Sequence, residues 1–301
     1  MRARTLLALT LAWGCGGTSA TDAGSVGVDS GSESTDAGLA MTQGPRIPIP
    51  TGACPDMSIA GTITVSPAGL APRDAQLYVS DAAATLDGPV VFYWHGTGSQ
   101  PREAEYGLGQ PMIDAILALG GMVIAPFHDP AAGTFPWYLT AGGQDDDLRV
   151  ADELLGCAAA SVGVDESRIH SIGMSAGALH TTQMSYRRAS YLASVVTYSG
   201  GLIGNRPRTD NGSNRFAALI FHGGPSDMVV VNFESLSVQY WQQLTDAGHF
   251  AAICDHGGGH VIPDARDSVW RFFQDHPFDT QPSPYASGLP AGFASICSLE
   301  P

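Results

Sequence analysis

The stretch that decides the fold is Ile169-His170-Ser171-Ile172-Gly173-Met174-Ser175-Ala176-Gly177-Ala178-Leu179. An apolar run leads into a Gly-x-Ser-x-Gly pentapeptide, and a helix-forming run follows it at once. Strand, sharp turn and helix in this order are typical of an elbow that exposes a nucleophilic serine. The alternative is a buried serine in a glycine-rich turn. Because a serine hydroxyl is a weak nucleophile without a base, the rest of the chain must decide between the two.

Short apolar runs alternate with longer helix-like segments on both sides of this stretch. The expected strands are Thr62–Val65, Ala75–Val79, Val90–Tyr93, Met122–Ala125, Ile169–Gly173, Ser194–Tyr198, Ala218–Phe221 and Ala251–Cys254. The expected helices are Pro111–Leu119, Asp145–Ala160, Ala176–Ala189, Phe233–Ala247 and Asp267–Asp275. The alternation predicts a single α/β domain, an eight-stranded and mostly parallel sheet with helices on both faces.

A second stretch, Val90-Val91-Phe92-Tyr93-Trp94-His95-Gly96-Thr97-Gly98, runs from an apolar strand into His-Gly-x-Gly. In hydrolases of this architecture such a loop gives a backbone N–H group to an oxyanion. We therefore expect an oxyanion hole made by the N–H of Ala176 and that of Thr97 or its neighbour. His95 is expected to anchor the loop rather than to act as a base.

Two later strands end in residues that suit an acid and a base. Leu219-Ile220-Phe221-His222-Gly223-Gly224-Pro225-Ser226-Asp227 presents Asp227, and Cys254-Asp255-His256-Gly257-Gly258-Gly259-His260 presents His260. Three glycines allow the second loop to fold back sharply toward the sheet. The order Ser175, Asp227, His260 is that of α/β-hydrolases and differs from that of chymotrypsin and subtilisin. The rivals are His256 for the base and Asp255 and Asp264 for the acid.

The run Val164-Asp165-Glu166-Ser167-Arg168-Ile169-His170 and the elbow after it resemble the secreted polyhydroxybutyrate depolymerase and feruloyl esterase group of α/β-hydrolases. The resemblance covers roughly residues 61–277 and includes the loops at His95, Asp227 and His260. It implies hydrolysis of a small or polymeric carboxylic ester through an acyl-enzyme, without a metal or organic cofactor. A Gly-Gly-Pro-Ser insertion ahead of Asp227 departs from the family pattern.

Aromatic residues near the predicted site are candidates for binding the substrate. We expect Trp94, Trp137 and Tyr138 to line an acyl pocket, since such sites are mostly apolar. Ordinary loop packing is an equally good interpretation of Trp137. His170 and His180 are expected to be core residues, and the Asp145-Asp146-Asp147 run to be a solvated helix start rather than a Ca²⁺ site.

The amino terminus is typical of an export signal. Arg2 and Arg4 precede a short apolar region, Leu6 to Trp13. Ala12-Trp13-Gly14-Cys15 resembles a lipobox and predicts a lipidated Cys15 that tethers the protein to a membrane; cleavage after Ala20 is the alternative. We expect a signal peptide over residues 1–15, a flexible acidic tether over residues 16–47 and a catalytic domain over residues 48–301.

Export also favours disulfide bonds between the remaining cysteines. Cys54 and Cys297 could join the two ends of the domain, or Cys54 could pair with Cys157 and Cys254 with Cys297. The formal net charge of −15 argues against a nucleic-acid partner. All fourteen basic residues are Arg, which excludes mechanisms that depend on a lysine.

The sequence thus predicts an exported serine esterase, either a secreted protein or a lipoprotein of the periplasm or outer surface. A catalytically inactive binding lipoprotein and a serine peptidase on the same fold are the alternatives.

Overall fold

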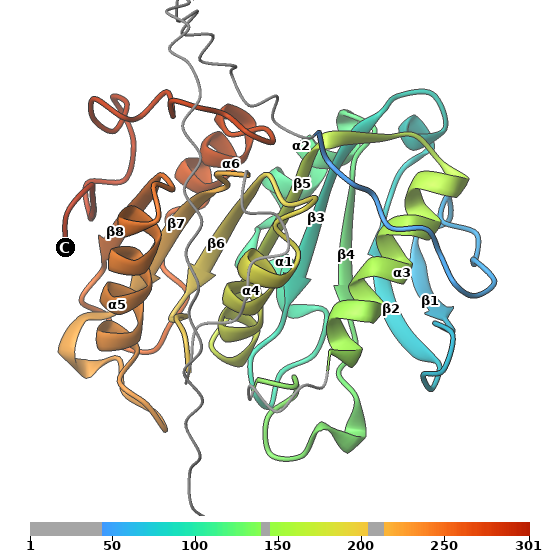
Figure 1. Ribbon diagram of the computed structural model, residues 1–301, viewed down its shortest axis with the longest axis horizontal. Helices are drawn as coiled ribbons and strands as arrows, with labels where there is room; N and C mark the ends of the chain where they lie inside the picture. The colour runs from blue at the N-terminus through green and yellow to red at the C-terminus, as the bar shows by residue number, and fades with distance from the viewer. Residues whose placement is uncertain (1–43, 140–144, 204–213) are drawn as a thin grey trace, which may run out of the picture. The chain divides into compact units, whose positions relative to one another are not determined.

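The computed structural model describes residues 44–139, 145–203 and 214–301. Within these ranges one nine-stranded sheet runs in the order β1-β2-β4-β3-β5-β6-β7-β8-β9 (Figure 1). Strands β3 to β8 are parallel wherever they pair with one another, while β2 and the edge strands β1 and β9 run antiparallel to their neighbours. The strands are β1 (Gly61–Val65), β2 (Arg73–Tyr78), β3 (Gly88–Trp94), β4 (Met122–Pro126), β5 (Val164–Met174), β6 (Ser194–Tyr198), β7 (Ala217–His222), β8 (Ala251–Asp255) and β9 (Cys297–Ser298).

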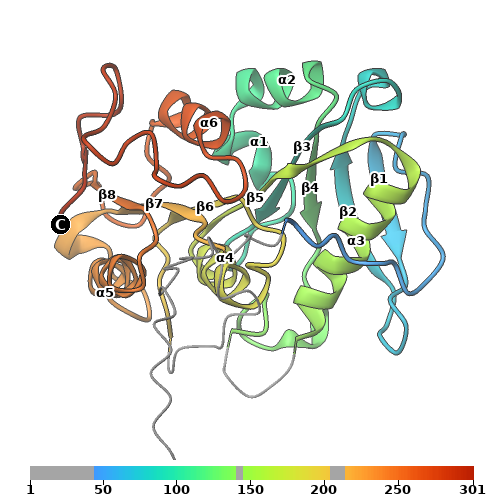
Figure 2. The same cartoon turned by 45° about the horizontal axis from the view of Figure 1, so that its top comes forward.

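Helices cover both faces of the sheet, as Figure 2 shows. The helices are α1 (Glu103–Gly107), α2 (Gln110–Ala118), α3 (Asp146–Ser161), α4 (Ala176–Arg187), α5 (Phe233–Asp246) and α6 (Arg266–Asp275). Apolar side chains of α3, α4 and α5 pack into one core, and those of α1, α2 and α6 into the core on the opposite face. Each sheet face therefore has its own hydrophobic layer.

The central strands are almost entirely apolar because helices cover both faces of the sheet. Every residue of β3, β4, β6 and β7 is buried, and strands buried on both faces need nearly continuous apolar runs. The edge strand β1 instead alternates between partly buried and exposed residues up to Val65. Its outer positions face water, as the period of two in a half-exposed strand requires.

The predicted α/β architecture is confirmed, with differences in detail. A ninth strand, β9, was not expected because its two residues are too few to show a pattern. The short helix α1 was also missed, and β5 begins at Val164 rather than at Ile169.

The disulfide bonds follow the second of the two expected pairings. Cys54 is bonded to Cys157 and Cys254 to Cys297, so the bond between Cys54 and Cys297 was the wrong alternative. Cys254 and Cys297 lie directly opposite each other in the antiparallel β8–β9 pair. Near the other bond, Glu153 on α3 accepts hydrogen bonds from the N–H groups of Thr51 and Gly52.

The proposed signal peptide, Cys15 and nearly all of the tether lie outside the described residues. Among the helices that are described, none has both the length and the hydrophobicity to cross a membrane.

Candidate active site

The strand register brings the carboxyl ends of β3, β5, β6, β7 and β8 to one edge of the sheet. Trp94 pairs with Gly173, and Met174 pairs with Tyr198. One strand further, Tyr198 pairs with Phe221. The loops that leave these strands therefore meet, as expected for a site at the carboxyl end of a parallel sheet.

Ser175 occupies the turn between β5 and α4 in an unusual backbone conformation. Its φ is 56° and its ψ is −119°, a region that non-glycine residues rarely adopt. Its N–H donates to the carbonyl of Tyr198 at 2.9 Å. A Cβ atom at Gly177 would lie 1.8 Å from the Trp94 carbonyl oxygen, and one at Gly173 would lie 2.5 Å from the Gly177 backbone. Both glycines are thus required by the close approach of β3 to the elbow.

Ser175, His260 and Asp227 form a continuous hydrogen-bonded chain. The Oγ atom of Ser175 lies 2.9 Å from Nε2 of His260. The Nδ1 atom of the same imidazole lies 2.7 Å from Oδ1 of Asp227. The Asp227 side chain is fully buried, whereas that of His260 is partly exposed. The structure thus brings together the three residues that the sequence pattern singled out, in an order that allows proton transfer from the serine to the imidazole.

The Gly-Gly-Pro-Ser insertion does not prevent Asp227 from reaching the imidazole. It forms the short 3₁₀ turn η3 (Gly224–Ser226), and the Asp227 N–H closes this turn on the Gly224 carbonyl. The other carboxylate oxygen, Oδ2, accepts hydrogen bonds from the Gly223 N–H at 2.9 Å and from the Ser199 hydroxyl at 2.7 Å. Burial would raise the pKa of Asp227, but the hydrogen bonds from His260, Gly223 and Ser199 outweigh it and hold the pKa below its usual value.

Ser199 is a site residue that sequence reasoning missed. It follows β6 directly and, like Ser175, is a non-glycine residue with a φ of 56°. Its N–H donates to the carbonyl of Phe221 on β7. Its place in the site could have been predicted from the sequence. Ser199 is a polar residue directly after the strand next to β5, and the loops after these two strands meet at the same edge of the sheet.

The rival acids and base have other partners. Asp255 accepts from the Gly257 N–H, and Asp264 pairs with Arg266. His256 accepts the Gly258 N–H at Nδ1, and burial lowers the pKa of its imidazole. His260, in contrast, stacks on Phe233 with ring centroids 4.6 Å apart, which holds the imidazole between the other two residues.

The loop after β3 lies against the elbow. A Cβ atom at Gly96 would lie 3.5 Å from the Ser175 Cβ, so this backbone passes directly beside the proposed nucleophile. Glu103 fixes the loop by accepting hydrogen bonds from the Gly96 N–H and the Tyr93 hydroxyl. Thr97 is exposed at the tip of the loop, and Ala176 begins α4. The first N–H groups of a helix have no intrahelical acceptor, so that of Ala176 is available to a ligand.

The aromatic residues near the site lie differently from the expectation. Trp94 and Trp137 are 0% and 1% exposed. The indole of Trp94 donates to Ser171 Oγ, and that of Trp137 donates to the His95 carbonyl. Trp94 therefore does not line an acyl pocket, and Trp137 takes the second of its two expected roles, loop packing. The two rings form a buried support for the His95–Gly98 loop and present almost no surface to a substrate. Tyr138 is partly exposed, and its role in substrate binding stays a prediction.

Other polar residues were expected in more ordinary roles. His170 and His180 are buried, and burial lowers the pKa of each to about 3, so both are neutral core residues. The expectation of a solvated helix start is wrong for Asp147, which is buried and paired with Arg73 at 3.0 Å. In the part of the chain that the structure describes, no cluster of three or more His, Cys, Asp or Glu residues has the geometry to hold a metal ion.

Several solved structures share this fold at low sequence identity. A pOPH variant in complex with DMSO aligns with a TM-score of 0.65 and 14% identity, over 82% of this chain and 95% of that chain. A ferulic acid esterase aligns with a TM-score of 0.54 and 15% identity, over 71% and 95%. An S-formylglutathione hydrolase from Agrobacterium tumefaciens aligns with a TM-score of 0.55 and 16% identity, over 75% and 98%. These likenesses show the α/β-hydrolase fold. No protein-family model and no curated protein matches the chain.

Proposed function

We propose that this protein is a serine hydrolase that cleaves carboxylic esters through an acyl-enzyme. The observation that carries the proposal is the hydrogen-bonded chain from Ser175 Oγ through the imidazole of His260 to Asp227. A hydroxyl becomes a strong nucleophile when a neighbouring imidazole accepts its proton. The lowered pKa of Asp227 keeps its carboxylate ionised at neutral pH, so that it can orient the ring and stabilise the imidazolium.

The reaction follows from these positions. His260 takes the hydroxyl proton as Ser175 attacks the ester carbonyl, and the imidazolium then donates this proton to the departing alcohol. Water, deprotonated by the same imidazole, attacks the acyl-enzyme and releases the acid. We assign the backbone N–H groups of Thr97 and Ala176 to the oxyanion. Each such donor typically lowers the barrier by about 3 kcal/mol.

Ester chemistry is favoured over peptide hydrolysis by the structural neighbours. They include a ferulic acid esterase, a thermostable esterase and a carboxylesterase from Bacillus cereus. Within esters, the resemblance found in the sequence points to polyhydroxyalkanoate and polyester chains or to feruloyl and acetyl groups on polysaccharides. The two disulfides agree with an exported domain, and we propose that lipidation of Cys15 tethers it to a membrane.

The test is hydrolysis of p-nitrophenyl esters of increasing acyl length by the parent and by Ser175→Ala. We expect kcat to fall by about 10⁴-fold or more in the variant, as in other enzymes that lose this nucleophile. A fluorophosphonate probe should label the parent and not Ser175→Ala.

The two histidines of one loop supply a matched control. His260→Ala should lose as much activity as Ser175→Ala, whereas His256→Ala should keep activity within about threefold because His256 bonds within its own loop. A parent protein that neither hydrolyses any ester nor reacts with the probe would favour the inactive binding lipoprotein instead.

A further inference from the structure

A second chain of imidazole hydrogen bonds ends on the loop that carries the proposed oxyanion donor. His95 begins this loop directly after β3, and its Nδ1 atom lies 2.9 Å from the Gly96 carbonyl oxygen. Its Nε2 atom lies 3.3 Å from Nδ1 of His128, which follows β4, the strand beside β3. His95 is fully buried, whereas His128 is partly exposed. Neither ring belongs to the hydrogen-bonded chain of the proposed nucleophile.

The chemistry of the partners fixes the direction of both bonds. A carbonyl oxygen only accepts, so Nδ1 of His95 carries a proton and donates to Gly96. Burial lowers the pKa of the His95 imidazole to about 4, so this ring is neutral at neutral pH and its Nε2 atom has no proton. The bond between the two rings therefore needs a proton on Nδ1 of His128, which donates to Nε2 of His95.

The bond to Gly96 acts on the peptide that provides the oxyanion donor. The Gly96 carbonyl and the Thr97 N–H belong to one planar trans peptide, so a bond that fixes the carbonyl also fixes the N–H on the opposite side. The same carbonyl accepts from the Ser99 N–H at 3.1 Å. Among the described residues the Thr97 N–H itself has no acceptor, whereas the Gly96 N–H is taken by Glu103. The N–H of Thr97 is thus the one of these two that a ligand can use.

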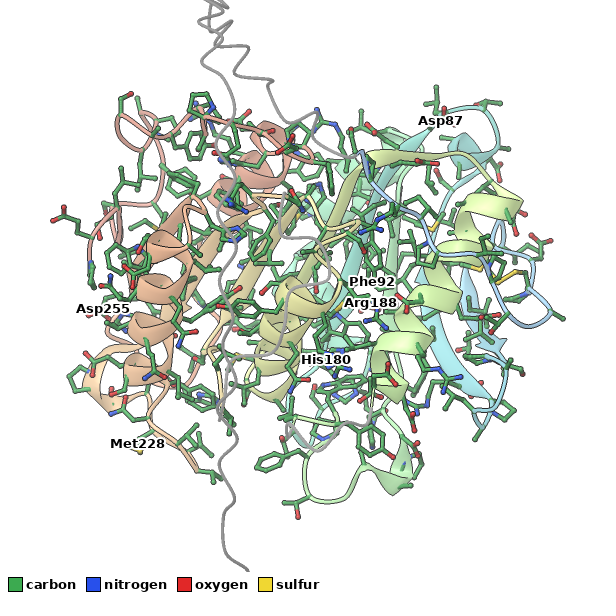
Figure 3. All side chains as sticks on the ribbon, in the orientation of Figure 1. Asp87, Phe92, His180, Arg188, Met228 and Asp255 are labelled. Atoms are coloured by element: carbon green, nitrogen blue, oxygen red, sulfur yellow. A yellow bond between two sulfur atoms is a disulfide. The ribbon has the colours of Figure 1, made fainter. Side chains whose placement is uncertain are left out.

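Other contacts hold the backbone of the loop but leave the His95 imidazole to His128. Trp137 donates its indole N–H to the His95 carbonyl at 2.9 Å. His180, labelled in Figure 3 below Phe92 of β3, packs against Trp137 with ring centroids 5.6 Å apart. Neither ring nitrogen of His180 has a hydrogen-bond partner among the described residues. Within the same ranges, His128 is the side chain that bonds to Nε2 of His95.

We infer that His128 is a positioning residue of the oxyanion hole, because it donates to His95 and so keeps the Thr97 N–H directed at the developing oxyanion. The inference rests on the proposed function, since this oxyanion forms only if the protein cleaves an acyl compound. Hydrogen bonds in a chain polarise one another, so the bond from His128 also strengthens the Thr97 N–H as a donor. A donor that acts on charge developed in the transition state contributes to kcat more than to KM.

The test compares two substitutions of nearly equal shape at one position. His128→Asn keeps an N–H donor close to the place of Nδ1, whereas His128→Leu removes it. The matched control is His249→Leu, because the His249 ring also donates from Nδ1 to a backbone carbonyl, that of Phe216, and burial also lowers its pKa to about 4. Both His249 and Phe216 lie just before the parallel strands β8 and β7, at the opposite end of the sheet from the proposed site.

We expect kcat for p-nitrophenyl butyrate to fall about tenfold in His128→Leu and to stay within about threefold of the parent in His128→Asn. This loss is smaller than the roughly 10²-fold or greater loss on removal of a whole oxyanion donor, because the Thr97 N–H is displaced and not removed. KM should stay within about twofold in both variants, and His249→Leu should match the parent in kcat and KM.

A second measurement reads the hydrogen bonds without any turnover. Imidazole ¹⁵N NMR of the parent at neutral pH should show a proton on Nδ1 and none on Nε2 of His95. It should also show a proton on Nδ1 of His128. The signals that vanish in His128→Asn identify His128, and those of the ring that it contacts shift with the substitution.

Three results would overturn the inference and leave the proposed function intact. The first is an equal kcat in the parent and His128→Leu, and the second is an equal loss in His128→Leu and His128→Asn. The third is a proton on Nε2 of His95 at neutral pH, which can be read from the parent even if His128→Leu does not fold. A parent that hydrolyses no ester is a different outcome: it removes the proposed function, and the inference falls with it whatever the tautomers.

Discussion

Asp147 and Asp227 are both buried carboxylates, but their partners differ in kind. Asp147, in the first turn of α3, accepts from the Arg73 guanidinium and from the Tyr138 N–H. Burial raises the pKa of Asp147 above its usual value despite these bonds, with Asp129 on the same guanidinium adding to the rise. Burial acts on Asp227 too, yet its donors hold the pKa below the usual value.

The difference lies in what each partner can do with a proton. A guanidinium donates hydrogen bonds without exchanging protons with its partner, so the Arg73–Asp147 pair is a fixed link between β2 and α3. An imidazole can accept a proton at one ring nitrogen while the other donates to a carboxylate, so the Asp227–His260 pair can take part in a reaction. Burial of a carboxylate therefore does not identify a catalytic acid, but burial against a titratable partner that also contacts a nucleophile supports that role.

The largest effect should come from Asp227→Asn. An amide in place of the carboxylate favours the wrong tautomer of His260, and we expect kcat on p-nitrophenyl butyrate to fall by about 10⁴-fold. The matched change Asp147→Asn should leave kcat within about threefold, because Asp147 touches no atom of the hydrogen-bonded chain. If the two variants lost activity equally, the distinction between the carboxylates would fail.

For stability we expect the opposite order, with Asp147→Asn more destabilising than Asp227→Asn. Asp147→Asn leaves the buried guanidinium of Arg73 with Asp129 as its remaining carboxylate partner and sets an amide NH2 group against one of the two donors, Arg73 or the Tyr138 N–H, so we expect the free energy of unfolding to fall by about 2 kcal/mol.

Asp227→Asn should cost less, because the imidazole can adopt its other tautomer and accept from the amide NH2, while the amide oxygen still accepts from Gly223 and Ser199. Urea denaturation of both variants measures this difference. A larger loss in Asp227→Asn would mean that the proposed acid is also the main structural carboxylate.

The same contrast explains which features of the site and the fold could be predicted from the sequence. Ser175, Asp227 and His260 were predictable because each follows an apolar strand and local patterns report the ends of strands. The link between Arg73 and Asp147 joins residues 74 positions apart, and nothing local to either one marks it. Burial of Trp94 was missed, and that of Trp137 was left as one of two interpretations, for a related reason. An aromatic residue near a catalytic loop has the same pattern whether it lies below the loop or faces the substrate.

A smaller effect on kcat is expected at Ser199, whose hydroxyl donates to the Asp227 carboxylate. Ser199→Ala removes one hydrogen bond to the Asp227 carboxylate, and we expect kcat to fall roughly tenfold. Ser199→Gly removes the same hydroxyl but suits the φ of 56°. It should match the alanine variant in kcat while exceeding it in stability by about 1 kcal/mol. Equal kcat in the parent and both variants would show that the hydroxyl does not position the acid.

The pH dependence of stability should differ in sign between the two carboxylates, and this is the smallest effect. The folded pKa of Asp227 lies below its ordinary value of 3.8, so its ionised form stabilises the fold above pH 3.8 and this contribution is lost as the pH falls through the folded pKa. The folded pKa of Asp147 lies above 3.8, so its contribution is present below that pH and is lost as the pH rises through the folded pKa.

Unfolding free energies of the parent minus those of Asp227→Asn should thus rise with pH below 3.8. The corresponding difference for Asp147→Asn should fall with pH above 3.8, and neither slope should exceed about 1.4 kcal/mol per pH unit, the limit for one proton. Slopes of the same sign would mean that folding shifts the pKa of both aspartates in the same direction. The contrast between the partners of Asp147 and those of Asp227 would then be wrong.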